Sequence, residues 1–304
     1  MKATIPDNLK AELPQNTWGK VLGMTPIIMT VIATLLAGIA SSEMTHAQYD
    51  RALGAQLQSK AGDQWGYFQA KKLRGALQQN TLELLQATIE IPPLDTVGIE
   101  AGIASLKSTA APQTLAALEK GALPAVPTPA EFKPNVKAAL DALNASKPEP
   151  EILRLLAQIS DQDLSEAMDA ARAQALAFDA VIKPVNTDLD HVEKNLTKPG
   201  AAKNLLQGFT AARLRFGTAR YDNEARLNQV VGNLYELQVR KSNASADRHH
   251  QRSGQFFYGM LTAQMGVIIS TFAIAARQKN LLWSLAAAAG LLAVSFSAYV
   301  FLRV

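Results

Sequence analysis

Three of the four histidines in the sequence stand near carboxylates at helical spacing, and these residues have the clearest potential for chemistry. Glu43 and His46 form a Glu-x-x-His pair, while His249 and His250 follow Asp247. Residues three or four apart share one face of a helix, and imidazole with carboxylate suits zinc, iron, manganese or nickel. The candidate metal ligands are Glu43, His46, Asp50, Asp247, His249 and His250.

These two groups are far apart in the sequence, so an antiparallel pair of helices has to bring them together. His46 follows the end of one apolar run closely, and His249 precedes the start of another by a similar distance. We therefore expect both groups at the same height beside a membrane, where a divalent metal is the candidate cofactor. The alternative is a solvated polar cluster at the level of the lipid headgroups, with no metal and no cofactor.

A second candidate site is the aromatic stretch of residues 59–75. Its distinguishing residues are Gln64, Trp65, Tyr67, Phe68, Gln69 and Lys71. Counting outward from the membrane along two antiparallel helices places Trp65 opposite residues 232–235, and the basic residues behind it opposite Asp222 and Glu224. The expected partners of the Trp65 ring are Val230, Val231, Leu234 and Tyr235. We interpret the stretch as a helix packing seam, with a ligand-binding patch as the alternative.

Three apolar segments have the length and composition of membrane-spanning helices. They are residues 21–40, 256–276 and 281–302, each close to the roughly 20 residues that a helix needs to cross a bilayer. Residues 1–20 form a polar N-terminal segment. The first apolar run resembles a cleaved signal peptide in part, but its long polar lead and its continuation into a helical pattern favour a membrane helix.

The prolines divide the rest of the chain. Eleven of the 14 lie from Pro92 to Pro199, and none lies between Pro26 and Pro92 or after Pro199. Because proline interrupts helices, residues 41–91 and 201–255 are predicted to be long ascending and descending helices. Residues 92–200 are predicted to be a proline-rich tip domain of short helices, one of which starts at an N-cap on Ser160 and ends at Pro184.

A heptad pattern in the descending helix indicates a coiled-coil-like stalk. One line of positions holds Phe209, Phe216, Asn223, Val230 and Leu237, and the other holds Leu206, Arg213, Arg220, Leu227, Leu234 and Lys241. Polar residues in such a seam select register or oligomeric state, so a homo-oligomer is expected. The predicted fold class is an all-α membrane protein: three transmembrane helices and a long antiparallel helical hairpin capped by short helices.

The positions of the positive charges favour one orientation in the membrane. Three crossings put the N-terminus and the turn at Arg277 and Lys279 on the same side. Short basic segments next to membrane helices stay in the cytoplasm, whereas long domains are translocated largely regardless of charge. We therefore expect a multi-pass protein of a bacterial inner membrane whose stalk faces the periplasm.

Composition and motifs favour a binding or structural protein over an enzyme. Lys and Arg number 30 against 26 Asp and Glu, which is too mixed for a nucleic-acid footprint, and the absence of Cys excludes thiolate chemistry. No nucleophile elbow, phosphate-binding loop or zinc-protease motif is present. We predict a self-associating scaffold that contacts membrane lipids and has no catalytic activity. The alternatives are an oligomeric channel lined by residues 256–276 and a metal-binding membrane protein.

The aromatic stretch also carries a family resemblance. Its residues Lys60, Ala61, Asp63, Gln64, Trp65, Tyr67, Gln69, Ala70 and Lys71 resemble the signature of a bacterial membrane-protein family known as domain of unknown function 4337. Phe68 stands where the signature has a second tyrosine, and the proline-rich middle is longer than usual. The resemblance implies a membrane helix before the motif and a membrane hairpin at the C-terminus, and it implies no activity.

Overall fold

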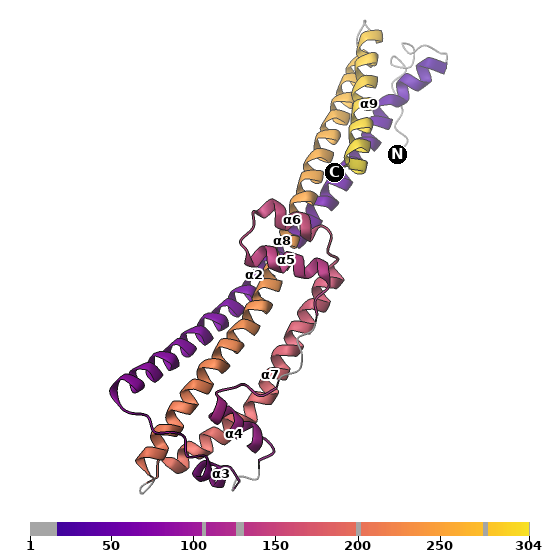
Figure 1. Ribbon diagram of the computed structural model, residues 1–304. Coiled ribbons are helices and arrows are strands. Elements are labelled where there is room, and N and C mark those ends of the chain that lie inside the picture. Colours follow the sequence, from indigo (N-terminus) through magenta and orange to yellow (C-terminus); the bar gives the residue numbers. More distant parts are fainter. Residues whose placement is uncertain (1–16, 105–107, 126–130, 199–201, 276–278, 304) are drawn as a thin grey trace. The chain divides into compact units, whose positions relative to one another are not determined.

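The chain consists of α-helices wherever its structure is described. The computed structural model describes residues 17–104, 108–125, 131–198, 202–275 and 279–303, and no strand occurs in these ranges. The helices, shown in Figure 1, are α2 (Thr17–Thr88), α3 (Thr96–Ala104), α4 (Ala111–Lys120), α5 (Pro134–Asn144), α6 (Glu149–Leu156), α7 (Asp161–Leu196), α8 (Lys203–Ala275) and α9 (Lys279–Arg303). The all-α prediction is confirmed.

These helices form two compact units, and α2 and α8 contribute to both. The first unit contains Met1–Gly54 and Ser242–Val304, and the second contains Ala55–Lys241. Within each unit α2 and α8 run antiparallel, as the predicted hairpin requires. Most of the predicted N-terminal segment, residues 1–16, and the basic turn at Arg277 lie outside the described residues.

The first unit contains three helical segments long and apolar enough to cross a membrane. They lie in α2, in α8 and in α9, with mean hydropathies of 1.9, 1.5 and 2.0 over their most apolar windows. Small side chains allow these helices to approach closely: Ala263, Ala286 and Ala293 are fully buried. Large apolar side chains such as Leu35 and Phe272 point outward instead, as they would toward lipid. The three predicted spans are therefore present as apolar helices.

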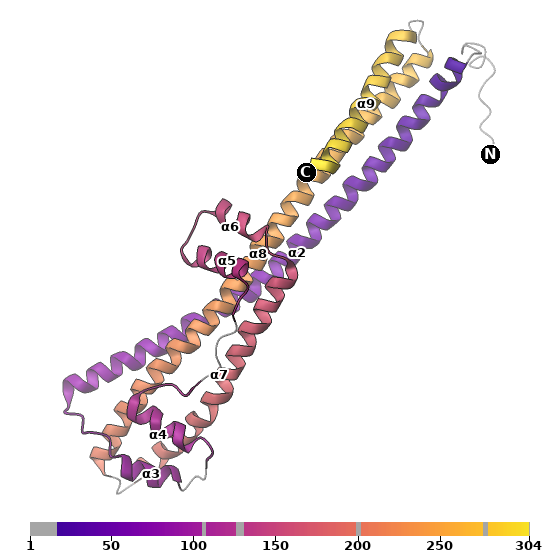
Figure 2. The ribbon, with the colours of Figure 1, turned by 45° about the vertical axis from the view of Figure 1, so that its right-hand side comes forward.

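In the second unit, α8 lies between α2 and α7. On one side, Gly75 packs against Tyr221 and Gln78 against Gly217, so numbers rise along α2 while they fall along α8. On the other side, α7 lies beside α8 in both Figure 1 and Figure 2. Two hydrophobic clusters hold this arrangement together.

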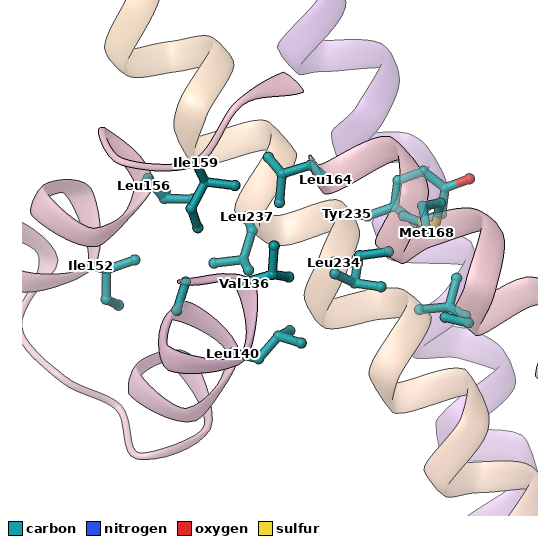
Figure 3. Packing of buried hydrophobic residues seen from close by; sticks show 14 of the residues in the cluster. Val136, Leu140, Ile152, Leu156, Ile159, Leu164, Met168, Leu234, Tyr235 and Leu237 are labelled. Atoms are coloured by element: carbon teal, nitrogen blue, oxygen red, sulfur yellow. The ribbon is translucent and has the colours of Figure 1, made fainter. Parts of the chain in front are cut away.

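The first cluster joins α5, α6, the start of α7 and Ala61 of α2 to residues 231–237 of α8. Leu164 and Met168 of α7 pack with Leu234 and Leu237 of α8, and Val136 of α5 is completely buried there (Figure 3). The amphipathic spacing of these residues explains why they share one side of each helix. The second cluster joins α3 and α4 to the later part of α7 and to α8, around Phe178, Phe209 and Phe216.

The prediction that Pro184 ends a helix is wrong, because α7 continues through it to Leu196. A proline inside a helix removes one backbone hydrogen bond and crowds the preceding turn. Here the residues after it bury large side chains: Val185 and Leu189 are 0% and 1% exposed in the second cluster. Burial of that apolar surface offsets the free-energy cost of the proline. The positions of the prolines in the sequence carry no information about this burial. The tip therefore contains one helix of 36 residues besides the short ones.

Three polar positions of the predicted seam, Arg213, Arg220 and Lys241, pair with α7 of the same chain. Arg213 contacts Asp190, at 2.5 Å, and Glu193. Arg220 donates a hydrogen bond to Asn186 at 2.6 Å. The heptad therefore has an intramolecular partner, and the expectation of a homo-oligomer stays a prediction.

The N-terminus of α7 has the predicted cap, and an ion-pair cluster reinforces it. Ser160 and Asp163 form a reciprocal capping box. Lys133 lies 2.6 Å from a carboxylate oxygen of Asp163 and 2.8 Å from one of Glu166. The hydrogen bond from Lys133 is the main reason that the pKa of Asp163 lies well below its usual range, and it lowers the pKa of Glu166 too.

The stability that this cluster contributes should disappear in acid. A carboxyl group with a lowered folded pKa stabilises the protein above its unfolded pKa of about 4 and loses that contribution as the pH falls further. We expect Lys133→Met to lower the thermal midpoint at pH 7, with a difference from wild type that shrinks below pH 4. The measurement is circular dichroism melting across pH, with exposed Lys137→Met as control. A difference that persists unchanged at pH 3 would contradict this account.

Gly208 of α8 is needed where the chain after α2 crosses that helix. A Cβ at this position would lie 3.2 Å from the carbonyl oxygen of Pro92 and 3.4 Å from that of Pro93. At Gly62 a Cβ would meet nothing within 4 Å. Alanine is a better helix former than glycine by about 1 kcal/mol, so Gly62→Ala should raise the thermal midpoint. Gly208→Ala should lower it, and an equal rise for both variants would show that the crossing is loose.

Candidate functional site

Trp65 occupies a defined position between α2 and α8 in the second unit. A Cβ built on Gly232 would lie 3.5 Å from the indole ring, so the glycine leaves room for the ring at this level. The indole Nε1–H donates a hydrogen bond to a carboxylate oxygen of Glu236 at 2.9 Å. Phe68, one turn further along α2, meets the indole edge to face with ring centroids 5.4 Å apart. The predicted height of Trp65 opposite residue 232 is therefore correct.

The indole has two partners on α8 outside the expected set, Gly232 and Glu236. Val231, Leu234 and Tyr235 belong to the first hydrophobic cluster, together with Ala61 of α2 and residues of α5, α6 and α7. Successive residues of a helix are separated by about 100°, so the residues that face α2 are Gly232 and, one turn later, Glu236. Sequence reasoning missed Glu236 because it looked for apolar partners. The i, i+4 relation to Gly232 was the signal that could have found it.

Lys71 and Lys72 pair with acidic residues of α8, as predicted, whereas the predicted level of Arg74 stays a prediction. Lys71 and Arg220 both contact Glu224, whose side chain is only 9% exposed, so two cations compensate a largely buried carboxylate. Lys72 lies 2.5 Å from Asp222 and is the main reason that the pKa of Asp222 is lowered. The charge pairs thus fix the register of the two helices at this level.

The other signature residues divide between the seam and the solvent. The Cβ of Gln64 lies beside Gly232, 3.6 Å from where a Cβ would be built on that glycine. Tyr67 is 57% exposed, and Gln69 is also exposed. The signature therefore contains a buried line that packs on α8 and an outer line that faces away from it.

A shallow cavity of about 410 Å³ lies beside Trp65 and extends toward α5 and α6. Its polar lining groups bond to one another: Arg240 pairs with Glu149, and Asn233 donates a hydrogen bond to Asn144 at 2.7 Å. A small polar molecule would have to compete with these internal contacts. The ligand-patch alternative therefore stays a prediction, whereas the packing seam accounts for the contacts of Trp65.

The first unit brings together half of the predicted metal ligands. His249 Nδ1 lies 2.6 Å from a carboxylate oxygen of Glu43, and Arg252 lies 3.4 Å from the other oxygen. The ring of His46 stacks on that of His249 with centroids 5.3 Å apart. These contacts place the two histidines at one height, as the register predicted. The carboxylate at the end of the apolar segment of α2 thus has two nitrogen partners.

The remaining candidate ligands take other positions. Asp247 faces Arg51 at 3.6 Å, Asp50 accepts a hydrogen bond from Ser242 through its backbone carbonyl, and His250 is exposed. Within the described ranges, no group of three or more His, Asp or Glu residues is placed to hold a metal ion. The metal hypothesis stays a prediction. The contacts in the structure are those of a polar cluster in which Glu43 contacts His249 and Arg252, and the rings of His46 and His249 stack.

The comparison with known families agrees with the resemblance in the signature. Residues 18–121 match the family described as Domain of unknown function (DUF4337). The match includes α2, α3 and α4 and ends at Gly121, the C-cap of α4. The partners of the signature on α8, among them Gly232 and Glu236, lie outside it. Neither a curated protein nor a solved structure matches the chain.

Trp65 should contribute to stability through both its ring and its N–H group. Trp65→Phe keeps a ring but leaves Glu236 without its donor, which we expect to cost about 1–3 kcal/mol. Trp65→Ala should lower the thermal midpoint further, because the contacts with Gly232 and Phe68 are lost as well. Tyr67→Ala, in the same motif but exposed, is the matched control and should change little. If Trp65→Ala unfolded at the wild-type temperature with its oligomeric state unchanged, the packing interpretation would fail.

Proposed function

We propose that this chain is a membrane-anchored scaffold without catalytic activity, which self-associates in the inner membrane of a bacterium. Three apolar helical segments supply the anchor. The second unit supplies helical surface outside those segments, oriented toward the periplasm. The observation that carries the proposal is an exposed row of leucines on α2.

This leucine row consists of Leu73, Leu77 and Leu84, which are 62%, 55% and 65% exposed. Their spacing of four and seven residues, with Asn80 between them, follows the a and d positions of a coiled coil. The opposite side of α2 packs against α8 at Gly75 and Gln78, and Leu82 on that side is buried. The leucine row is therefore a second apolar face of α2, on the side away from α8. Single exposed leucines are common on protein surfaces, whereas a contiguous apolar row indicates an interaction surface.

A second copy of the same chain fits this face. Two copies inserted in the same orientation bring their α2 helices together in parallel, so each leucine meets its counterpart and the two Asn80 amides, each with donors and an acceptor, meet as well. The flanking positions carry no repulsive pairs in this register. Arg74 falls opposite Gln69 of the other copy, and Glu83 falls opposite Thr88.

The leucine row can be tested by placing a charge in it. We expect Leu77→Asp to raise the dissociation constant of the detergent-solubilised oligomer at least about tenfold, because a carboxylate would be buried between two helices. Sedimentation equilibrium on the full chain gives this constant. Leu176→Asp, at an exposed leucine of α7, is the matched control and should leave it unchanged. A monomeric wild type would refute the scaffold proposal, and an unaffected Leu77→Asp would remove the leucine row from it.

A further inference from the structure

Gln264 places a polar amide on the outer face of the apolar segment of α8. Its side chain is exposed and makes no hydrogen bond to any part of the chain that the structure describes. The residue lies in the middle of the predicted span 256–276, where neither lipid tails nor bulk water can satisfy the amide. An unsatisfied amide in hydrocarbon costs several kcal/mol.

The threonine and serine hydroxyls described in this segment are satisfied within their own helix. The hydroxyl of Thr262 donates to the carbonyl of Tyr258 at 2.9 Å, and that of Thr271 donates to the carbonyl of Val267 at 2.8 Å. Threonine can satisfy itself in this way because its hydroxyl reaches the preceding turn. The amide of Gln264 has two donors and an acceptor, so it requires a partner from outside the described helices.

The amide lies at the edge of an outward-facing groove between α2 and α8 in the first unit. The groove has a volume of about 460 Å³ and is lined by Thr30, Ala33, Thr34, Ala37, Gln264, Val267 and Ile268. The hydroxyls of Thr30 and Thr34 donate to carbonyls of their own helix at 2.8 and 2.9 Å, so they add little polarity to the groove. Small side chains on α2 leave room for a close approach by another helix.

We propose that this groove seats a second copy of the chain, with the two Gln264 amides hydrogen-bonded to each other across a two-fold axis along the membrane normal. Copies inserted in the same orientation hold Gln264 at the same depth, and such an axis brings identical residues together. A primary amide is its own complement, since it offers both a donor and an acceptor. Ile268, 50% exposed, supplies an apolar side chain that can enter the groove of the other copy.

This interface rests on the self-association proposed above but uses a different surface from the leucine row. The two surfaces lie in different units of the chain, so a substitution in one surface does not change the residues of the other. Each surface can therefore be tested alone in the full-length protein.

The test compares Gln264→Leu with Gln264→Asn and Thr262→Val. Sedimentation equilibrium of the full chain in mild detergent gives the dissociation constant of the dimer. Gln264→Leu should weaken the dimer roughly tenfold or more, the effect of losing interhelical hydrogen bonds in an apolar medium. Gln264→Asn retains an amide and should restore part of the affinity. Thr262→Val should have no effect, because the Thr262 hydroxyl bonds only within its own helix.

Cross-linking locates the interface independently of affinity, because the chain contains no cysteine. Ile268→Cys should form a disulfide-linked dimer on oxidation in membranes, whereas Leu292→Cys, on the exposed face of α9, should not.

The outcomes separate this interface from the scaffold as a whole. A dimer that Gln264→Leu leaves intact but Leu77→Asp weakens would overturn the groove and keep the scaffold. A monomeric wild type would overturn both. A larger ring that conducts ions and depends on Gln264 would replace the paired amides with a pore.

Discussion

The antiparallel pairing of α2 with α8 determines which side chains can meet in both units. In the first unit it brings Glu43 to His249, and in the second it brings Trp65 to Gly232 and Lys72 to Asp222. In each unit the residue numbers on α8 fall as those on α2 rise. A shift of one helix along the other would separate these charged partners, and a charge that is buried without its partner is costly.

The polar positions along α8 follow from this pairing. Arg213 and Arg220 stand where a coiled coil would carry apolar residues, yet each has acidic or amide partners within the chain. Glu224 shows the principle in its clearest form: two cations, Lys71 and Arg220, surround a carboxylate that is nearly buried. Such groups specify one register more strongly than they stabilise the fold, because a slip of one residue would leave them unpaired.

Among the described residues, we assign an external partner to two surfaces. One is the row of exposed leucines on α2, and the other is the amide of Gln264 beside an apolar groove. Their chemistry differs. Removing the leucine side chains from water is favourable, and so is removing the Gln264 amide from hydrocarbon into a hydrogen bond. Both call for another helix, which is why we favour self-association over catalysis for this protein.

Periodicity and composition alone determined the helical class, the three apolar segments, the capping of α7 at Ser160 and the height at which Trp65 meets α8. These features depend on spacing along one chain or on counting outward from an apolar run, so local rules suffice. Three other features depend on tertiary contacts, which spacing along the chain does not specify. The burial of Val185 and Leu189 accompanies the continuation of α7 through Pro184, and Glu236 accepts the hydrogen bond from the Trp65 N–H. Three of the six candidate metal ligands meet in one cluster, and the other three take other positions. In each case the outcome depends on the direction in which a side chain points around its helix and on the surface that a neighbouring helix presents to it. Neither quantity is present in the sequence of either helix by itself.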